Sequence, residues 1–240
     1  MKRQAKDYIV FPLDLPDYEQ AMPYVEKLSP HVGLFKVGLE LFVSQGPSVV
    51  RSIKNAGPAE VFLDLKLHDI PATMKRAFMA ASRHGVRFVT AHCDAGDRAL
   101  REISNISDGQ TQILAVTVLT SMDQQALLNI GYAPRYANDI SSLVLLRAQM
   151  AKHAGCHGIV CSGKEIGQMR RALGPDFVMV TPGIRPSWAV VGNDDQKRIV
   201  TPAQAVEAGA DYIVIGRPIR DAKDPADAAK RVAEEIARFI

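Results

Sequence analysis

A carboxylate and an ammonium group interrupt one apolar stretch of the chain. Asp64 and Lys66 alternate there with Leu63, Leu65 and Leu67. On a strand, residues two apart face the same side at a spacing of about 7 Å, so the two charges would share one face and the leucines the other. Burying such a pair is costly unless partners satisfy both charges. The pair is therefore either an ion pair that fixes a protein interior or part of a site that binds a polar ligand.

Three more charged residues lie in or directly after short apolar runs, namely Asp14, Lys36 and Asp69. Four or five charges of alternating sign favour a ligand site over a buried structural ion pair. Asp69 stands apart, because Pro71 disfavours a helical conformation of Ile70 and can occupy the first turn of the helix that follows. We therefore expect Asp69 in an extended loop that points away from its own strand. A helix-capping carboxylate is the alternative interpretation.

A Gly-Arg pair near the end of the chain is the best candidate for binding an anion. Gly216 offers a backbone N–H with no side chain in front of it, and Arg217 adds a fork of donors that matches phosphate oxygens. A surface arginine on a tight turn is the alternative. Neither Gly183 nor Gly216 belongs to a G-x-G-x-x-G or P-loop pattern, so no dinucleotide or nucleoside triphosphate site is indicated.

The elements that must position these residues alternate along the chain. We expect strands at Tyr8–Leu13, Gly33–Val37, Glu60–Leu65, Phe88–Ala91, Gln112–Val118, Gly158–Cys161, Phe177–Thr181 and Asp211–Ile215. We expect helices at Asp17–Leu28, Pro47–Ala56, Thr73–His84, Ile140–Ala154, Pro202–Ala208 and Pro225–Phe239. Several strands lack polar alternation, which is typical of parallel strands buried on both faces. The pattern predicts a single-domain α/β protein over residues 1–240, a closed (β/α)8 TIM barrel, with a doubly wound open sheet as the second choice.

In such barrels the working residues lie at the carboxyl ends of the strands and in the loops that follow. The residues that satisfy this rule are Asp14, Lys36, Asp64, Lys66, Asp69, Thr120, Ser121, Arg185, Gly216 and Arg217. Residues 183–200 make a long segment between the seventh strand and its helix, and a loop of that length in a compact domain is usually functional. The sequence therefore predicts one polar site at this end of the barrel.

Composition excludes several classes of protein. The net charge of +3 is spread along the chain rather than gathered in a basic patch, so no nucleic acid partner is expected. No apolar run approaches the roughly 18 residues of a membrane span. Cys93, Cys156 and Cys161 form no C-x-x-C pair and are expected to be reduced thiols. The short polar N-terminus indicates no signal peptide, and together these features predict a cytoplasmic protein.

The best candidate for binding a metal is the run His92-Cys93-Asp94 at the end of the fourth predicted strand. Adjacent residues on a strand point in alternate directions, which is poor geometry for chelating one ion. We therefore expect no metal, and we find no pattern typical of an organic cofactor site.

The charged segment forms part of a longer pattern, D-x-K-x-x-D-I-P-x-T, over residues 64–73. Supporting blocks lie at residues 13–14, 35–38, 117–122, 181–186 and 215–219. With these blocks in this order, the sequence closely resembles the orotidine 5′-phosphate decarboxylases, especially the bacterial ones. A bare D-x-K-x-x-D is shared with related sugar-phosphate lyases, whereas the I-P-x-T extension and the other blocks are far more specific.

The resemblance implies decarboxylation of orotidine 5′-monophosphate (OMP) to UMP and CO2, the last step of de novo UMP synthesis, without a metal or an organic cofactor. It makes Lys66 the proton donor to C6 of the pyrimidine ring, with Asp64 near the departing carboxylate. Lys36 and Asp69 would complete a network of alternating lysines and aspartates. An ammonium held by fixed carboxylates can both stabilise and protonate a carbanion-like centre.

The resemblance also implies a homodimer, in which Asp69 and Thr73 serve the active site of the partner subunit, and it makes Ile70 a substrate-binding residue. Asp14 and Lys36 would bind the ribose hydroxyls. The remaining substrate contacts would come from Thr120 and Ser121 at the pyrimidine edge, Pro182 against the ring, and Arg185, Gln196, Gly216 and Arg217 at the phosphate. The stretch from Arg185 to Gln196 is slightly longer than in usual bacterial members.

Two rival functions are left open by the residues alone. A magnesium-dependent sugar-phosphate decarboxylase or aldolase of the same barrel superfamily would use the same D-x-K-x-x-D strand, and loss of activity in EDTA would identify it. A catalytically silent protein that binds a phosphorylated ligand would keep the same charges without any turnover.

Overall fold

Parallel strands form the centre of the molecule. In the computed structural model, which describes residues 3–189 and 200–240, they are β1 (Ile9–Pro12), β2 (Leu34–Val37), β3 (Glu60–Leu67), β4 (Phe88–His92), β5 (Gln112–Val116), β6 (Gly158–Val160), β7 (Val178–Thr181) and β8 (Tyr212–Val214). Each strand pairs with its neighbour in sequence, and β8 pairs with β1 through Ile213 opposite Ile9. This last pairing closes the sheet. The predicted (β/α)8 barrel is therefore confirmed, and the open-sheet alternative is wrong.

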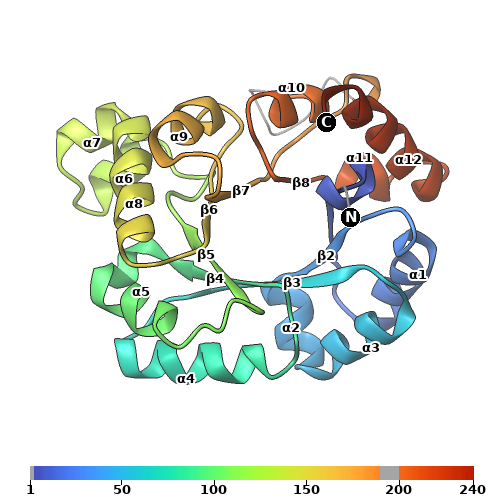
Figure 1. Cartoon of the computed structure of the whole chain (residues 1–240), viewed down its shortest axis with the longest axis horizontal. Coiled ribbons are helices and arrows are strands. Elements are labelled where there is room, and N and C mark those ends of the chain that lie inside the picture. The colour runs from blue at the N-terminus through green and yellow to red at the C-terminus, as the bar shows by residue number, and fades with distance from the viewer. Residues whose placement is uncertain (1–2, 190–199) are drawn as a thin grey trace.

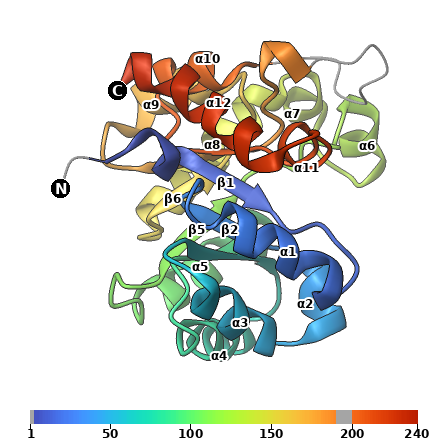
Figure 2. The same ribbon diagram turned by 90° about the vertical axis from the view of Figure 1, so that its right-hand side faces the viewer.

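Helices surround the barrel and connect its strands (Figure 1). In the described residues they are α1 (Tyr18–Leu28), α2 (Leu39–Gln45), α3 (Ser48–Ala56), α4 (Pro71–Ser82), α5 (Gly96–Ser104), α6 (Gln124–Asn129), α7 (Pro134–Asn138), α8 (Ile140–His153), α9 (Ile166–Leu173), α10 (Pro202–Glu207), α11 (Arg217–Arg220) and α12 (Pro225–Ile236). Short 3-10 helices are η1 (Ala5–Tyr8), η2 (Cys93–Ala95), η3 (Ser187–Ala189) and η4 (Ala237–Phe239). In the side view β1 points toward the end of the barrel where α2, α6, α7 and α11 lie (Figure 2).

Alternate strand positions fill the barrel interior. One layer of buried apolar side chains comes from seven of the strands: Val10, Leu34, Phe62, Phe88, Leu114, Val180 and Val214. The positions two residues further along face the same way, and they include Lys36 on β2 and Asp64 on β3. The apolar layer therefore lies beneath the charged residues. Leu63, Leu65 and Leu67 pack instead into the larger core beneath the helices, as predicted.

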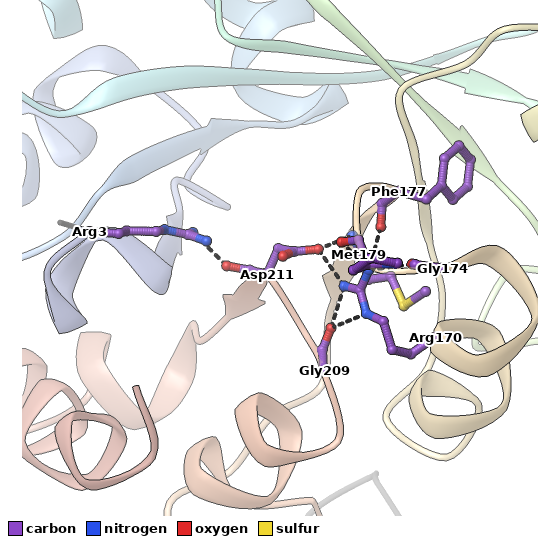
Figure 3. A network of polar contacts seen from close by, with 8 residues as sticks. Arg3, Arg170, Gly174, Phe177, Met179, Gly209 and Asp211 are labelled. Atoms are coloured by element: carbon purple, nitrogen blue, oxygen red, sulfur yellow. Dashed lines mark hydrogen bonds and ion pairs between the residues drawn. The ribbon is translucent and has the colours of Figure 1, made fainter. Parts of the chain in front are cut away.

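One arginine is hydrogen-bonded to the loops before β7 and β8, at the amino-terminal end of the barrel (Figure 3). Arg170 on α9 donates hydrogen bonds to the carbonyl groups of Gly174, Pro175, Phe177 and Gly209, and to the Asp211 carboxylate. Asp211 also accepts from the Met179 N–H at 2.8 Å, and its carbonyl accepts from Arg3 at 2.5 Å. These bonds fix the segments that lead into β7 and β8.

The three cysteines, Cys93, Cys156 and Cys161, are free and buried. Burial raises the pKa of each thiol to about 12. The thiolate, which is the form that reacts and binds metals, is therefore scarce at neutral pH. Among the described residues, no helix has both the length and the apolar character needed to cross a bilayer.

Candidate active site

A cavity of about 370 Å³ opens at the carboxyl ends of the strands. The predicted site residues that line it are Asp14, Lys36, Asp64, Lys66, Thr120, Pro182, Arg185, Gly216 and Arg217. Apolar strand residues, among them Phe62 and Val214, complete its walls. Apolar walls with a few convergent polar groups are typical of a small-molecule site. The strand-end rule therefore located residues that the fold does bring together.

Two lysines and two aspartates form a continuous row along this cavity. Lys66 Nζ lies 2.9 Å from Asp64 Oδ2, and Lys36 Nζ lies 3.6 Å from the same oxygen. Lys36 Nζ also lies 2.8 Å from Asp14 Oδ1. The side chains of Lys36 and Asp64 are 13% and 12% exposed, whereas that of Lys66 is 34% exposed. The row is thus buried at its centre, and the Lys66 ammonium is held by a carboxylate while it stays accessible to a ligand.

The backbone at Lys66 departs from strand geometry. Its φ of 49° is the only positive value of a non-glycine residue in the described part of the chain, and this left-handed region costs such a residue roughly 1–2 kcal/mol. The pairing with β4 also shifts between Leu63 and Leu67. Irregularities of this kind are common next to active sites, where they redirect a side chain. The strand is therefore distorted at the point where it presents Lys66 to the cavity.

A buried threonine on β4 is hydrogen-bonded to the distorted segment of β3. Thr90 Oγ1 donates to Asp64 Oδ1 at 3.0 Å and accepts from the Lys66 backbone N–H at 2.8 Å. The hydroxyl thus orients the carboxylate and satisfies a backbone donor in the irregular part of the strand. The sequence did not predict this role, because a threonine inside an apolar strand is common and its partners depend on the register of two strands.

The second half of the charged segment leaves the cavity. Asp69 and Ile70 are exposed, Ile70 to 66%, and neither they nor Thr73 line the cavity. The Asp69 carboxylate accepts the Ile70 N–H at 2.6 Å. Pro71 begins α4, and Ile70 is extended before it, as the sequence predicted. Within one chain, this loop holds the three residues away from the charged row.

Three arginines lie on the cavity wall beside β7 and β8, namely Arg185, Arg217 and Arg220. Gly216 precedes α11, and a Cβ at this position would lie 3.0 Å from Pro12 Cγ, so glycine permits the close approach to β1. Arg185 is 6% exposed. Arg220 was not predicted, because it lies on α11 beyond the strand end. The wall concentrates positive charge that suits an anionic group.

The segment after β5 reaches the cavity in part. Thr120 lines it, whereas Ser121 lines a neighbouring cavity of about 1030 Å³ beside the α6–α7 segment. Both residues are exposed. The structure therefore places Thr120 in the wall and Ser121 next to the opening. Gln196 lies outside the described residues.

The model of the orotidine 5′-phosphate decarboxylase / HUMPS family matches residues 7–232. The chain belongs to this family. It is 49% identical over 239 residues to the orotidine 5′-phosphate decarboxylase of Desulfosudis oleivorans, which covers 99% of this chain and 96% of that protein. It is 46% identical over 244 residues to the enzyme of the same name from Trichlorobacter lovleyi, with 99% and 98% covered. Among solved structures, orotidine 5′-phosphate decarboxylase from Lactobacillus acidophilus matches with a TM-score of 0.82 at 35% identity, covering 95% of this chain and 98% of that one.

In this member of the decarboxylase family, the metal candidate His92-Cys93-Asp94 belongs to a cluster of hydrogen-bonded side chains. Asp94 accepts hydrogen bonds from Arg147 and Tyr132 and lies 3.0 Å from His92 Nδ1. Burial lowers the pKa of His92, which Asp94 opposes. Burial and then the hydrogen bond to Asp94 raise the pKa of Tyr132, so the phenol stays a donor. Within residues 3–189 and 200–240, no three His, Cys, Asp or Glu side chains are grouped to hold a metal ion.

Proposed function

We propose that this chain decarboxylates OMP to UMP and CO2 without a metal or an organic cofactor, as the last step of UMP synthesis in the cytoplasm. The observation that carries the proposal is the row of Lys36, Asp64 and Lys66 in the barrel-mouth cavity of a member of this family. The relatives named above are orotidine 5′-phosphate decarboxylases, which supports the substrate.

The difficulty of this reaction is the electron pair that it leaves behind. The bond between C6 and the carboxylate breaks, CO2 departs, and the pair stays on C6 in an in-plane orbital that no carbonyl group can accept. The Lys66 ammonium stabilises this pair and then donates its proton to form the C6–H bond. The resulting amine regains a proton from water. Because Asp64 holds the ammonium at 2.9 Å, its position is set before the reaction begins, which is the preorganised arrangement that lowers barriers.

The phosphate provides binding energy at a distance from the reacting carbon. Gly216 and Arg217 bind it in this proposal, with Arg185 and Gln196 from the segment after β7. Their positive charge suits a dianion. Energy gained there can be used to hold C6 against Lys66. Support comes from the arginine-lined wall beside β7 and β8.

The ribose and the ring occupy the space between the phosphate end and the lysines. Asp14 and Lys36, joined at 2.8 Å, bind the ribose hydroxyls. Pro182 packs on the ring, and Thr120 and Ser121 recognise its polar edge. Thr120 and Pro182 lie on the cavity wall, whereas Ser121 must turn inward from the neighbouring cavity to make its contact.

The active unit in this proposal is a homodimer. Asp69, Ile70 and Thr73 project from one chain, and Asp69 completes the charge network of the partner's site. Support comes from the exposed apolar side chains that follow β2 and β3, since Val43 is 79% and Ile70 is 66% exposed. Leu39, one turn before Val43 on the same face of α2, is also 52% exposed, and exposed apolar side chains that share a face suit a surface that another chain covers.

The proposal is tested by following the absorbance of OMP after the purified protein has been treated with EDTA. We expect UMP to form at the same rate with and without EDTA. If no UMP forms, the proposal is wrong. Loss of activity in EDTA that Mg²⁺ restores, or turnover of a ketose phosphate, would instead support the sugar-phosphate alternative.

Replacing Thr90 by valine tests whether the Thr90 hydroxyl holds Asp64 and Lys66 of the charged row in place. The Lys66 N–H and the buried Asp64 Oδ1 would lose this partner, and an unsatisfied buried group costs about 1–3 kcal/mol. We expect the free energy of unfolding in urea to fall by about 2 kcal/mol and kcat for OMP to fall about tenfold, or roughly 1.4 kcal/mol of barrier. Thr111→Val is the control, because its hydroxyl bonds the Val86 carbonyl just before β5 and should affect stability alone. Equal kcat values for the two variants would contradict the supporting role.

A further inference from the structure

A buried arginine joins three segments at the rim of the barrel mouth. Arg147 on α8 is 7% exposed. One of its terminal nitrogens donates to the Thr117 carbonyl, and the other donates to Asp94 Oδ1 and to the Tyr132 hydroxyl. Tyr132 also donates to Asp94 Oδ1 at 2.5 Å. The partners belong to the segments after β4 and β5 and to the turn between α6 and α7, so a single guanidinium connects all three.

These contacts hold residues 117–139, the segment between β5 and α8 that we call the excursion. It carries Thr120 and Ser121, the two residues assigned to the pyrimidine ring. Thr117 directly follows β5, and Thr120 and Ser121 come shortly after it. Tyr132 lies further along the same excursion, after α6. The apolar side chains of this excursion form a small cluster with Leu143 of α8, and Val118 and Ile140 join this cluster to the main core. Beside these apolar contacts, Arg147 binds the excursion at two points, the Thr117 carbonyl and the Tyr132 hydroxyl.

The hydrogen-bonded cluster of Arg147, Asp94 and Tyr132 also contacts the β3 side of the site. Asp94 lies 3.0 Å from His92 Nδ1, and the His92 ring stacks on His68 with the centroids 5.5 Å apart. His68 stands between Lys66 and Asp69 in the charged segment. A continuous set of contacts thus runs from the segment that holds the proton donor to the excursion after β5.

A buried arginine with several acceptors does not by itself influence a site. Arg170, which is partly buried, makes the same kind of contacts at the other end of the barrel, where it binds loop carbonyls and Asp211 (Figure 3). Arg147 differs in position, because its partners belong to the loops that border the cavity. Comparing variants of Arg147 and Arg170 therefore separates the effect of contacts that border the cavity from the effect of losing an arginine with several hydrogen-bond acceptors.

We propose that Arg147 is a positioning residue that sets how tightly the site binds the pyrimidine ring, by fixing the excursion that carries Thr120 and Ser121. This inference rests on the proposed function, since it assigns the ring of the nucleotide to that side of the cavity. Tyr132 and Asp94 act through the same cluster, and none of the three touches the substrate.

The test compares two ligands that share ribose and phosphate but differ in the ring, UMP and ribose 5-phosphate. Their dissociation constants are measured by calorimetry for the wild type, Arg147→Lys and Tyr132→Phe. We expect UMP binding to weaken about tenfold in Arg147→Lys and about threefold in Tyr132→Phe, as loss of one or two buried hydrogen bonds predicts. Binding of ribose 5-phosphate should stay within about twofold. The kcat/KM for OMP should fall in parallel with UMP affinity.

Arg170→Lys is the matched control, and it should lower Tm while leaving both dissociation constants at the wild-type values. The inference is overturned if the Arg147 and Tyr132 variants lose affinity equally for both ligands, or for neither. Tyr132→Phe keeps the ring and the Arg147–Asp94 ion pair, so it gives the answer even where Arg147→Lys does not fold. Wild-type turnover of OMP is measured separately. Its absence overturns the proposed function, whereas unchanged UMP affinity in variants of an active enzyme overturns only the inference about Arg147.

Discussion

Lys66→Ala is expected to lower kcat for OMP by about 10⁴-fold or more. General acid catalysis alone typically contributes 10²–10⁴-fold, and removing one preorganised electrostatic partner of the transition state costs a further 10²–10³-fold. Lys66 is assigned both roles, and no other ammonium in the described row can reach the same place, since Lys36 Nζ is already shared between Asp14 and Asp64. Single-turnover measurement of UMP formation gives the value.

The fold of this variant is expected to persist, so the loss can be assigned to chemistry. Asp64 would keep Lys36 at 3.6 Å and the Thr90 hydroxyl at 3.0 Å, and Lys66 is partly exposed. The control is Lys27→Ala, which removes an exposed lysine 3.0 Å from Asp224 and should change kcat by less than about twofold, as surface ion pairs contribute little. A Lys66→Ala protein that melts like the wild type and retains more than about 1% of kcat would contradict the assignment of the proton donor.

The strands were predictable because buried parallel strands have a local signature. The expected Glu60–Leu65 became β3 at Glu60–Leu67, and Phe177–Thr181 became β7 at Val178–Thr181. Closure of the barrel was not fixed by any local pattern, because it depends on β1 pairing with β8 from the opposite end of the chain. Counting strands favoured the barrel, but only the three-dimensional pairing excludes the open sheet.

The site was predictable to the extent that it follows strand ends. Asp14, Lys36 and the Asp64–Lys66 pair converge because the carboxyl ends of neighbouring parallel strands meet at one rim. The positive φ of Lys66 and its bond to Thr90 could not be predicted, since both depend on the register of β3 against β4. The same holds for Arg147, which in sequence is an ordinary arginine within a helix and only in the fold joins three loops.

Co-refolding Lys66→Ala with Asp69→Ala should restore activity that neither variant shows alone. If Asp69 acts in the partner's site, a mixed dimer has one site with both substitutions and one site with neither. With equal amounts and random pairing, about half of the dimers are mixed, so about a quarter of wild-type activity should return in this twofold-symmetric assembly. The initial rate of UMP formation, compared with that of an equal amount of refolded wild type, measures the recovery.

The control for this experiment pairs two substitutions from the same wall of one cavity. Asp64 and Lys66 are 2.9 Å apart in one chain, so a mixed dimer of Asp64→Ala and Lys66→Ala has one damaged residue in each site and should stay inactive. Recovery with Asp69→Ala but not with Asp64→Ala therefore requires that Asp69 and Lys66 of one site come from different chains. No recovery with either partner, from dimers shown to be mixed, would contradict the shared site. The exposed loop that ends at Pro71 would then have to be explained by a role other than completing the charge network.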